Sequence, residues 1–318
     1  MVKIGLIGCG RVAENHAQAI SACPGAKLVA AGGGRNAQQF GERHNIKILP
    51  REEICTLPDI DAVLVLTPPQ NHFEYVMSAL KNGKHVLVEK PVSFNIDEVE
   101  TMKSFSAQKG LVCMPGHSYI YLPEIARIKK ASCSGSIGTP TYLYMSEAYY
   151  MPPELFCKYQ GPEIDVLCHQ LYMSLAFLGV PTHISAFSSN FDNNIIETGG
   201  PQVIVNLKYG NGALAQIVVS WAGEDNTSDP WTFKIKLLGS NGGIHFSRRD
   251  FVQNNGYGYE QVLYQEMFDQ QMRFFINNCI IGSEEPLSTI SDAAWVCRLH
   301  NMILRSIETG STVSISEN

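Results

Sequence analysis

Short apolar runs alternate with amphipathic stretches through the first third of the chain. Amphipathic stretches with helical spacing lie at residues 36–44, 71–82 and 96–109. The runs between them are rich in Val and Leu, which is typical of parallel strands buried on both faces. They lie at residues 4–7, 27–31, 62–67, 85–88 and 111–114. This alternation predicts an α/β domain over residues 1–118, a doubly wound parallel sheet with ligands at the carboxyl ends of its strands.

The pattern changes after residue 118, where longer strand-like runs appear. Turn-forming sequences at residues 209–212 and 239–243 predict hairpins. The expected strands lie at residues 141–147, 184–191, 202–209, 213–221 and 233–238. Helical spacing is found at residues 122–131, 161–179, 264–277 and 291–307. We therefore expect a second, α+β domain over residues 119–318, with a large and mostly antiparallel sheet.

The first apolar run ends directly in a glycine-rich turn, Gly8-Cys9-Gly10-Arg11-Val12-Ala13, and a helical pattern follows. Gly8 permits the tight turn, Gly10 lets a phosphate approach the backbone, and Ala13 lets the helix pack closely on the strand. In Rossmann domains this arrangement presents backbone N–H groups to the pyrophosphate of a dinucleotide. We predict cofactor contacts from Gly8, Gly10, Arg11 and Val12; an ordinary glycine-rich turn is the alternative.

Composition and charge exclude several classes of function. Hydrophobic residues make up 45% of the 318 residues, charged residues 17%, and the net charge is −6. An acidic balance with scattered Lys and Arg argues against nucleic-acid binding. No apolar stretch is long enough to span a membrane, and an apolar strand is predicted directly at residue 4, so we expect no signal peptide.

The nine cysteines are expected to be reduced. None belongs to a Cys-x-x-Cys pair, and several stand in apolar contexts, which is typical of small buried side chains in a reducing cytoplasm. The lack of ligand spacing also argues against a zinc site. We expect a cytoplasmic protein that holds no metal and contacts neither membrane nor nucleic acid.

Three further motifs accompany the glycine-rich turn. Thr67-Pro68-x-x-x-His72 and Glu89-Lys90-Pro91 each follow a predicted strand, and Asp165-x-x-x-His169 lies in the second domain. Together they resemble the glucose–fructose oxidoreductase/inositol dehydrogenase (Gfo/Idh/MocA) family of NAD(P)-dependent oxidoreductases, over essentially the whole chain. The resemblance implies hydride transfer between nicotinamide and a secondary alcohol or ketone of a sugar, cyclitol or related polyol. It also implies that Thr67, Pro68, His72, Glu89 and Lys90 belong to the cofactor site.

Lys90 stands at the carboxyl end of a strand and is expected to face the ligand crevice. Like charge and desolvation disfavour an ammonium group beside an oxidised nicotinamide, which lowers its pKa. Such a lysine can exchange a proton with a hydroxyl group as hydride leaves the same carbon. Pro91 restricts Lys90 to an extended conformation. The resemblance implies the same catalytic role, and the alternative is a surface lysine.

Asp165 and His169 stand four residues apart in a predicted helix that begins at Gly161-Pro162 and ends near Gly179. Spacing of four places the carboxylate and the imidazole side by side on one face. Taken alone, such a pair is more often a contact on a helix surface. The family resemblance implies a substrate-contacting carboxylate at Asp165 and a general base at His169, with Lys90 as partner or relay.

The position that selects the cofactor departs from the NAD pattern. Rossmann domains that bind NAD usually carry an acidic residue about 20 residues past the glycines, where it binds the ribose 2′-hydroxyl. Here the second strand runs into Gly32-Gly33-Gly34-Arg35, without a carboxylate. An arginine there can bind a 2′-phosphate or stack on adenine. We therefore expect NADP to be favoured over NAD, with Arg35 in the cofactor site; a surface role for Arg35 is the alternative.

Several aromatic and polar residues are candidates for a polyol pocket, because Tyr, Trp and His join an apolar face to a polar tip. The predicted substrate-binding set consists of His117, Tyr119, Tyr149, Asp165, His169 and Trp221. Two other functions stay open: a dinucleotide-sensing regulator of the same fold that does not turn over, and an NAD-dependent glycosidase.

Both faces of the predicted second sheet are partly apolar. Val203, Val205 and Leu207 alternate with Ile204, and residues 217–219 are consecutive apolar residues. A sheet of this kind usually buries one face in the core and the other against a partner. We expect a homodimer or homotetramer formed through this sheet.

Overall fold

The structure is a computed structural model that describes residues 1–152, 156, 161–189, 200–223, 233–246 and 259–315. Two compact units divide the chain. The first, here called the dinucleotide unit, contains Met1–Leu122 and Gln261–Cys297; the second, here called the sheet unit, contains Pro123–Glu260 and Arg298–Asn318. The second segment of the dinucleotide unit differs from the sequence-based boundary, which assigned everything after residue 118 to one domain.

The dinucleotide unit is built on a six-stranded sheet in the order β3-β2-β1-β4-β5-β6, and every pairing is parallel. Its strands are β1 (Val2–Ile7), β2 (Ala26–Gly32), β3 (Lys47–Ile48), β4 (Ala62–Val65), β5 (His85–Val88) and β6 (Cys113–Pro115). The chain turns back at β1, the topological switch point at which ligands bind in such sheets. The predicted doubly wound sheet is confirmed.

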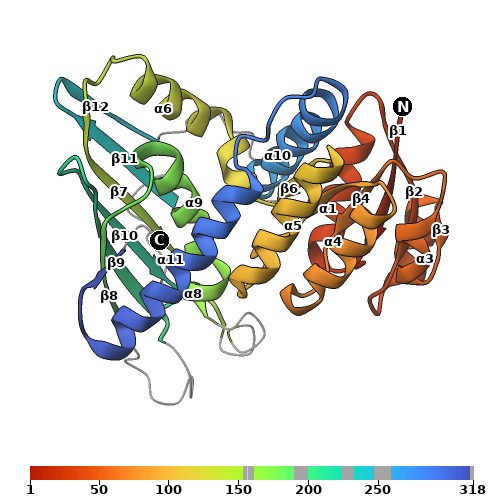
Figure 1. The fold of residues 1–318 in the computed structure, drawn as a ribbon, viewed down its shortest axis with the longest axis horizontal. Helices are drawn as coiled ribbons and strands as arrows, with labels where there is room; N and C mark the ends of the chain where they lie inside the picture. The colour runs from red at the N-terminus through yellow and green to blue at the C-terminus, as the bar shows by residue number, and fades with distance from the viewer. Residues whose placement is uncertain (153–155, 157–160, 190–199, 224–232, 247–258, 316–318) are drawn as a thin grey trace. The chain divides into compact units, whose positions relative to one another are not determined.

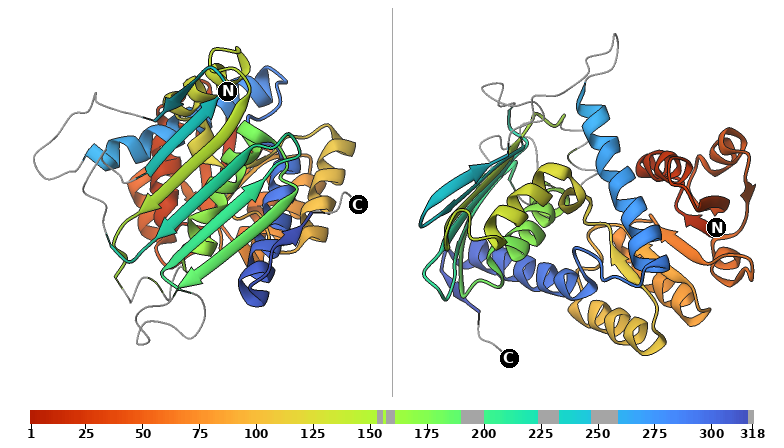
Figure 2. Two further views of the ribbon diagram at one scale, coloured as in Figure 1. Left: turned by 90° about the vertical axis from the view of Figure 1, so that its left-hand side faces the viewer. Right: turned by 90° about the horizontal axis from the view of Figure 1, so that it is seen from above.

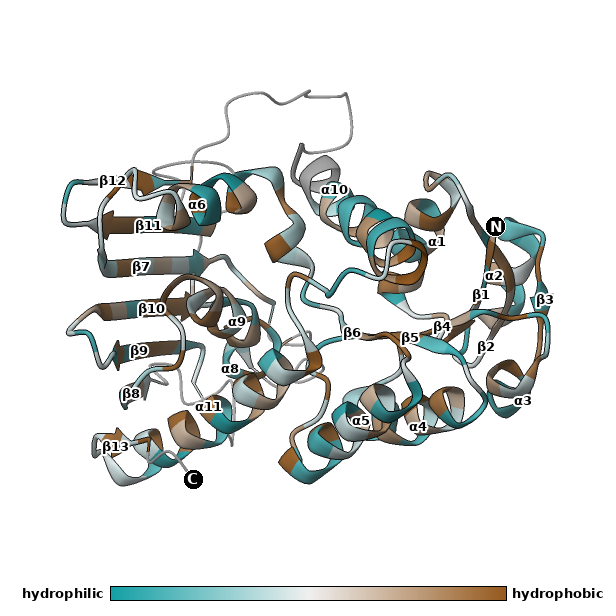
Figure 3. Cartoon of the chain, turned by 45° about the horizontal axis from the view of Figure 1, so that its top comes forward, coloured by the Kyte–Doolittle hydropathy of each residue, from teal (hydrophilic) through white to brown (hydrophobic). Residues whose placement is uncertain are grey.

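Helices cover both faces of this sheet (Figure 3). They are α1 (Arg11–Ser21), α2 (Ala37–His44), α3 (Arg51–Thr56), α4 (His72–Lys81), α5 (Ile96–Lys109) and α10 (Tyr259–Arg273). Short helices η1 (Pro69–Asn71), η2 (Ser118–Tyr121) and η3 (Phe274–Ile281) follow β4, β6 and α10. Helices α4 and α5 lie on one face, whereas α1 and α10 lie on the other.

Local sequence fixes the ends of α5. The Asn95 side chain accepts a hydrogen bond from the Asp97 N–H at 3.0 Å, which caps the first turn. Gly110 ends the helix with a φ of 63°, the left-handed conformation that glycine adopts without strain. The predicted helix at residues 96–109 is therefore confirmed to the residue.

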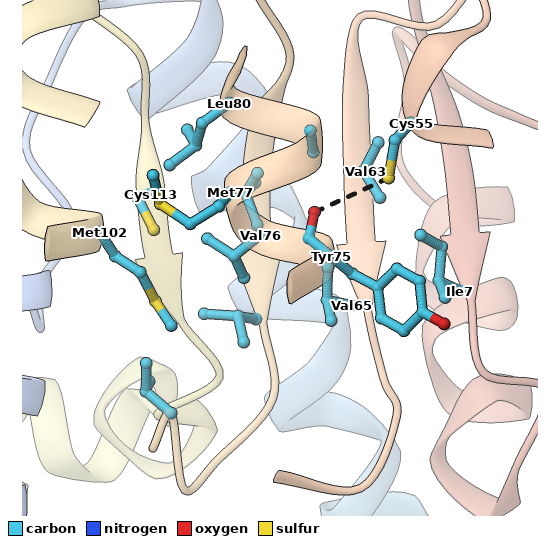
Figure 4. Close-up of a cluster of buried hydrophobic side chains, with 14 of the residues drawn as sticks. Ile7, Cys55, Val63, Val65, Tyr75, Val76, Met77, Leu80, Met102 and Cys113 are labelled. Carbon is cyan, nitrogen blue, oxygen red and sulfur yellow. Dashed lines mark hydrogen bonds between the residues drawn. The ribbon is translucent and has the colours of Figure 1, made fainter. Parts of the chain in front are cut away.

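A continuous apolar core fills the space between the sheet and α4 and α5. Val63, Val65, Val86 and Val88 of the strands meet Val76 and other side chains of α4. Figure 4 shows Val76, Met77 and Leu80 of α4 in this cluster, with the Cys55 thiol donating to the Tyr75 carbonyl at 3.7 Å. Strands buried on both faces explain why their sequences are continuous apolar runs.

Helix α10 returns to the dinucleotide unit from the far end of the sequence. The Gln265 side-chain amide donates to the Asn15 carbonyl at 3.0 Å, and Phe268 meets the edge of the His16 ring at 4.9 Å between centroids. Ala293 and Ala294, in the first turns of α11 (Ile290–Thr309), join the same core as β4 and α4. A contact of this kind has no local sequence signature.

The sheet unit contains a seven-stranded sheet in the order β12-β11-β7-β10-β9-β8-β13. The strands are β7 (Pro140–Ala148), β8 (His183–Ser189), β9 (Gln202–Lys208), β10 (Leu214–Ser220), β11 (Phe233–Gly239), β12 (Gly242–His245) and β13 (Val313–Ser314). All pairings are antiparallel except that of β7 with β10. The predicted antiparallel sheet and both hairpins are confirmed. Residues 190–191, the end of the strand predicted at residues 184–191, lie outside the described residues.

Figure 1 and Figure 2 show helices on one face of this sheet. They are α6 (Pro123–Cys133), α8 (Pro162–Asp165), α9 (Leu167–Leu178) and the end of α11. Val203, Val205 and Leu207 are buried toward this face, while Ile204 is 38% exposed on the other. The alternation places apolar residues on both faces, as the sequence predicts.

The helix predicted over residues 161–179 is interrupted. Helix α8 ends at Asp165, and α9 begins at Leu167, with Val166 between them. The His169 N–H bonds to the Val166 carbonyl at 2.9 Å, three residues back instead of four. The prediction of one continuous helix was wrong, because a tighter turn separates Asp165 from His169.

The cysteines behave largely as small apolar side chains. All eight that the structure describes are free thiols, and Cys133 is the exposed one among them. Burial raises the pKa of Cys113 to about 12 and that of Cys9 to about 11. Among the described helices, none is both long and apolar enough to cross a membrane.

Leu299 and Leu304 provide a matched test of which face of α11 is core. Leu299 is fully buried and Leu304 is 41% exposed. We expect Leu299→Ala to lower the free energy of unfolding by about 2–5 kcal/mol, because it leaves a cavity. Leu304→Ala should change it by about 0.5 kcal/mol or less. Urea denaturation of both variants measures this, and equal effects would contradict the assigned face.

Candidate functional site

The turn after β1 requires glycine at residue 8. Gly8 has a φ of 108°, and a Cβ atom there would lie 2.6 Å from the Leu66 carbonyl oxygen. The Gly8 N–H bonds to the Gly32 carbonyl at 2.8 Å, which ties this turn to the end of β2. The conformation and the close approach of β4 both exclude a larger residue.

Gly10 begins α1 and leaves open space beside it. A Cβ atom at Gly10 would meet nothing within 4 Å, and Gly10 caps the helix without a side-chain hydrogen bond. Ala13, on the buried face of α1, is fully buried. Backbone N–H groups of the first helical turn therefore border an accessible site at the carboxyl edge of the sheet, and this arrangement fits a pyrophosphate. Arg11 is exposed and Val12 is half-buried on the same turn.

The loop after β4 borders the same edge of the sheet. Thr67 is buried, and its hydroxyl oxygen has no hydrogen-bond partner among the described residues, while Pro68 is exposed. A buried hydroxyl group without a partner is rare in folded proteins and is often found where a ligand binds. Thr67 therefore fits a dinucleotide site as well.

His72 links this loop to the loop after β5. Its Nε2 lies 2.7 Å from the Thr67 carbonyl, and its Nδ1 lies 3.0 Å from the Pro91 carbonyl. The ring is fully buried, and burial lowers its pKa although the carbonyl groups partly offset the effect. His72 thus holds the two loops together through their backbones, and its predicted cofactor contact stays a prediction.

Glu89 stands at the end of β5 in a buried network. Its Oε1 lies 2.9 Å from Nε2 of His16 on α1, and its Oε2 accepts the Lys90 N–H at 3.0 Å. Burial raises the pKa of Glu89, but the hydrogen bond and charge of His16, together with Lys90, outweigh it and leave the pKa lowered. A carboxylate held in this way fixes the backbone at Lys90. The Lys90–Pro91 peptide bond is cis.

His117 follows the end of β6 as a buried histidine, and the charge of Lys90 acts on it. Nδ1 of His117 lies 2.6 Å from the Ser288 hydroxyl oxygen. Burial, followed by the charge of Lys90, lowers the pKa of His117 to about 3. His117 is therefore neutral at physiological pH, and a neutral imidazole can accept or donate one hydrogen bond at each nitrogen. Tyr119, in the next turn, is also buried.

In the sheet unit, His169 is bonded to a tyrosine on its own helix. Its Nδ1 lies 2.8 Å from the Tyr172 hydroxyl oxygen, and the two rings meet edge to face. Both side chains are buried, whereas Asp165 is half-exposed. The neighbour that orients the imidazole is thus a phenol three residues later, which the sequence pattern did not assign.

Two further groups lie near the ends of β7 and β10. The Gln170 amide donates to Glu147 at 2.9 Å, and both residues are buried. Trp221 packs against Tyr149 and Phe156 at 6.2 and 5.1 Å between ring centroids. The indole N–H of Trp221 and the Gln170 Oε1 have no hydrogen-bond partner among the described residues. These two buried polar atoms fit a ligand with hydroxyl groups.

The structure distributes the predicted residues between its two units. Gly8, Gly10, Thr67, His72 and Lys90 gather at one edge of the first sheet, and His117 and Tyr119 belong to the same unit. Asp165, His169, Tyr149 and Trp221 belong to the sheet unit. Among the described residues, no group of three His, Cys, Asp or Glu side chains has the arrangement of a metal site.

Sequence reasoning missed the residues that support this set. His16 falls on the buried face of α1, where periodicity predicts an apolar residue, and a polar residue at such a position is the available signal. Ser288 lies 171 residues from His117, and no local pattern joins them. Tyr172 stands one helical turn after His169, so the sequence predicts that they share a face. It does not predict the hydrogen bond between the Tyr172 hydroxyl and the His169 ring.

Family models match most of the chain. A model of an oxidoreductase family with an NAD-binding Rossmann fold matches residues 2–117, and the model of the Gfo/Idh/MocA C-terminal domain matches residues 125–245. Relatives are similar over nearly the full length. The scyllo-inositol 2-dehydrogenase (NAD(+)) of Bacillus subtilis is 26% identical, over 92% of this chain and 90% of that protein. The 1,5-anhydro-D-fructose reductase of Ensifer adhaerens is 29% identical, over 99% of each.

Solved structures share the fold. The scyllo-inositol dehydrogenase of Lactobacillus casei, with bound NAD(H) and scyllo-inositol, superposes with a TM-score of 0.87. It is 19% identical, and the match covers 99% of each chain.

Glu163, in the first turn of α8, is a buried acid with a perturbed titration. Burial raises its pKa to about 7, although a hydrogen bond from its own backbone partly opposes the shift. Its Oε2 has no hydrogen-bond partner among the described residues. The folded state therefore favours the protonated form, and the stability that this supplies is present below the ordinary pKa near 4.5 and lost as pH rises through about 7.

We expect Glu163→Gln to be more stable than the wild-type protein at pH 8, by on the order of 2 kcal/mol, and little different at pH 4. The amide keeps the shape of the protonated acid and cannot ionise. Thermal unfolding across this pH range measures the effect, with Glu308→Gln, an exposed residue of the same unit, as control. Parallel pH profiles for wild type and Glu163→Gln would contradict the assignment.

Proposed function

This chain belongs to the Gfo/Idh/MocA family of NAD-binding oxidoreductases, and on that premise we propose that its substrate is a cyclitol, sugar or related polyol. A hydride would move between nicotinamide and a secondary alcohol or ketone carbon of that substrate. The observation that carries the proposal is the end of β5, where the buried Glu89 carboxylate, bonded to His16, fixes the backbone of Lys90 at the ligand edge of the sheet.

The dinucleotide unit supplies the residues that would hold the cofactor. The open backbone at Gly10 and the first turn of α1 would bind the pyrophosphate, and Thr67 and Pro68 would border the dinucleotide further along the sheet edge. When bound, the nicotinamide supplies a carbon that accepts or donates hydride. We propose NADP over NAD, because β2 ends in glycines and no carboxylate follows them.

Proton transfer is assigned to His169 and Lys90. Hydrogen bonding of Nδ1 to Tyr172 orients the His169 imidazole, and we assign the transfer to Nε2, on the other side of the ring. Asp165 would bind a substrate hydroxyl. In the dinucleotide unit, the Lys90 ammonium would exchange a proton with the reacting oxygen or relay it.

The choice of a polyol follows from the buried polar groups of the sheet unit. The Trp221 indole N–H donates and the Gln170 Oε1 accepts, and both lack protein partners among the described residues. Glu147, which Gln170 holds, adds a carboxylate. Buried donors and acceptors, together with an aromatic ring, suit a ligand that combines hydroxyl groups with an apolar ring face. The similar proteins named above act on scyllo-inositol and 1,5-anhydro-D-fructose.

Lys90→Ala and His169→Ala test the chemical assignment. We expect each to lower kcat by about 10²- to 10⁴-fold, the contribution typical of a positioned acid or base. The measurement is nicotinamide absorbance with a panel of myo-inositol, scyllo-inositol, 1,5-anhydro-D-fructose, aldoses and their keto forms. Lys81→Ala and His245→Ala change exposed residues and should keep wild-type rates.

The outcomes separate the proposal from its alternatives. Wild-type rates in either Lys90→Ala or His169→Ala would remove that residue from the mechanism. Tight dinucleotide binding without turnover on the whole panel would favour a sensor, and release of free sugar from an aryl glycoside would favour a glycosidase.

Self-association through the exposed face of the second sheet is also proposed. Phe187 is 61% exposed on β8 and pairs with Ile204 of β9, which pairs in turn with Val218 of β10. This row of apolar side chains crosses three strands on the face without described helices. We expect the wild-type protein to be a dimer or tetramer at micromolar concentration by light scattering, and a Phe187→Lys, Ile204→Lys variant to dissociate. A wild-type monomer would contradict the proposal.

A further inference from the structure

Arg51 lies directly over the residue at which the cofactor's ribose is expected. Gly33 follows β2 with a φ of 78°, and a Cβ atom there would lie 2.8 Å from Cδ and 2.9 Å from Cγ of Arg51. The arginine side chain therefore occupies the space that any larger residue at position 33 would need. Position 33 carries no carboxylate, because the Arg51 side chain fills the space that an aspartate or glutamate there would need.

The fold brings Arg51 to this place from the next strand. β3 pairs with β2, and the Leu49 N–H extends the pairing with a hydrogen bond of 3.0 Å to the Ala31 carbonyl. Arg51 follows two residues later, at the start of α3. Arg51 and the glycine-rich turn both border the end of β2, although they are about 40 residues apart in the sequence.

Among the residues that the structure describes, none is an acidic partner for the positive charge of Arg51. Its guanidinium donates to the Tyr75 hydroxyl at 3.4 Å, and no carboxylate of the described residues lies within the 4.0 Å of an ion pair. The side chain is nevertheless half-buried. Arg43, which is more exposed, pairs with Glu14. A partly desolvated guanidinium without a carboxylate is available to an anionic ligand.

Gly33 also touches the predicted pyrophosphate turn. The Cys9 N–H bonds to the Gly33 carbonyl at 2.8 Å, and a Cβ atom at Gly34 would lie 3.3 Å from the Cys9 backbone. Gly33 thus lies between Arg51 on one side and Cys9 on the other, and it connects the guanidinium to the turn at Gly8–Gly10. A dinucleotide bound at that turn would carry its adenosine ribose toward Gly33 and Arg51, because the ribose 2′ position is read after β2 in such folds.

Resting on the proposed NAD(P)-dependent function, we infer that Arg51 is the specificity-determining residue that binds the 2′-phosphate of NADP. Its planar guanidinium presents two donors to phosphate oxygens. Arg35, the residue that sequence reasoning assigned to this contact, is exposed on the loop and would be secondary. The glycine at position 33 keeps Arg51 over the site, and an aspartate there would pair with Arg51 and repel the phosphate.

Calorimetric titration of NADP and NAD into wild type, Arg51→Gln and Arg35→Gln tests the inference without relying on turnover. We expect Arg51→Gln to weaken NADP binding by about 10- to 100-fold, the value of a lost charge-assisted contact. NAD binding should stay nearly unchanged, and Arg35→Gln should affect NADP less than Arg51→Gln does. Gln keeps a polar, hydrogen-bonding side chain while removing the charge, and Arg51→Lys shows whether charge alone suffices.

The outcomes separate this inference from the function on which it rests. Equal losses for NADP and NAD in Arg51→Gln would overturn it, since they would indicate stacking on the adenosine. A selective NADP loss in Arg35→Gln alone, or a wild type that prefers NAD, would also overturn it. Wild-type protein that binds neither dinucleotide would instead contradict the proposed function. If Arg51→Gln fails to fold, wild-type affinity for adenosine 2′,5′-bisphosphate over 5′-AMP decides, and no preference overturns the inference.

Discussion

The buried hydrogen bond between His16 and Glu89 is the contact on which the dinucleotide unit depends. It joins the first helix after the glycine-rich turn to the end of β5, across 73 residues of sequence. Neither side chain is stable in an apolar interior by itself, because a buried carboxylate without partners costs several kcal/mol. Together they form a fixed point at which α1, the loop after β5 and α10, through Phe268, meet.

The loops around this fixed point are held mostly by backbone contacts. The two ring nitrogens of His72 lie against the carbonyl groups of Thr67 and Pro91, and the N–H groups of Gly8 and Cys9 donate to the carbonyl groups of Gly32 and Gly33. Four strand ends are thus connected by groups that are not expected to touch substrate. In such a scaffold the backbone itself sets the places of side chains that come from distant sequence positions.

Sequence predicted the regular elements well, because their signals are local. Helix α5 and strand β5 have the expected ends, where an asparagine cap, a left-handed glycine and an apolar run decide the structure. The parallel first sheet followed from the alternation of apolar runs and helical stretches, and the antiparallel second sheet followed from the change of this pattern after residue 118. The break at Val166 was not predicted, since the apolar stripe continues through it and only the backbone turns more tightly.

The candidate site could be predicted only in part. Sequence motifs identified Lys90 and His169 as candidates. The residues that hold and orient the site are brought to it by long-range packing, which no motif predicts. His16 meets Glu89, Ser288 meets His117, and Arg51 meets Gly33, and each pair is joined by the fold instead of by spacing. The placement of residues 261–297 in the first unit has the same origin, because α10 packs on α1 through contacts such as Gln265 with Asn15.

A double-mutant cycle between His16 and Glu89 tests the central claim most directly. His16→Asn, Glu89→Gln and the combined variant are compared with wild type by the free energy of unfolding and by the affinity for the dinucleotide. If the pair holds the unit together, the two single changes are strongly coupled, by about 2 kcal/mol in stability, and each weakens dinucleotide binding. Effects that add within about 0.5 kcal/mol, with dinucleotide affinity unchanged, would contradict the account.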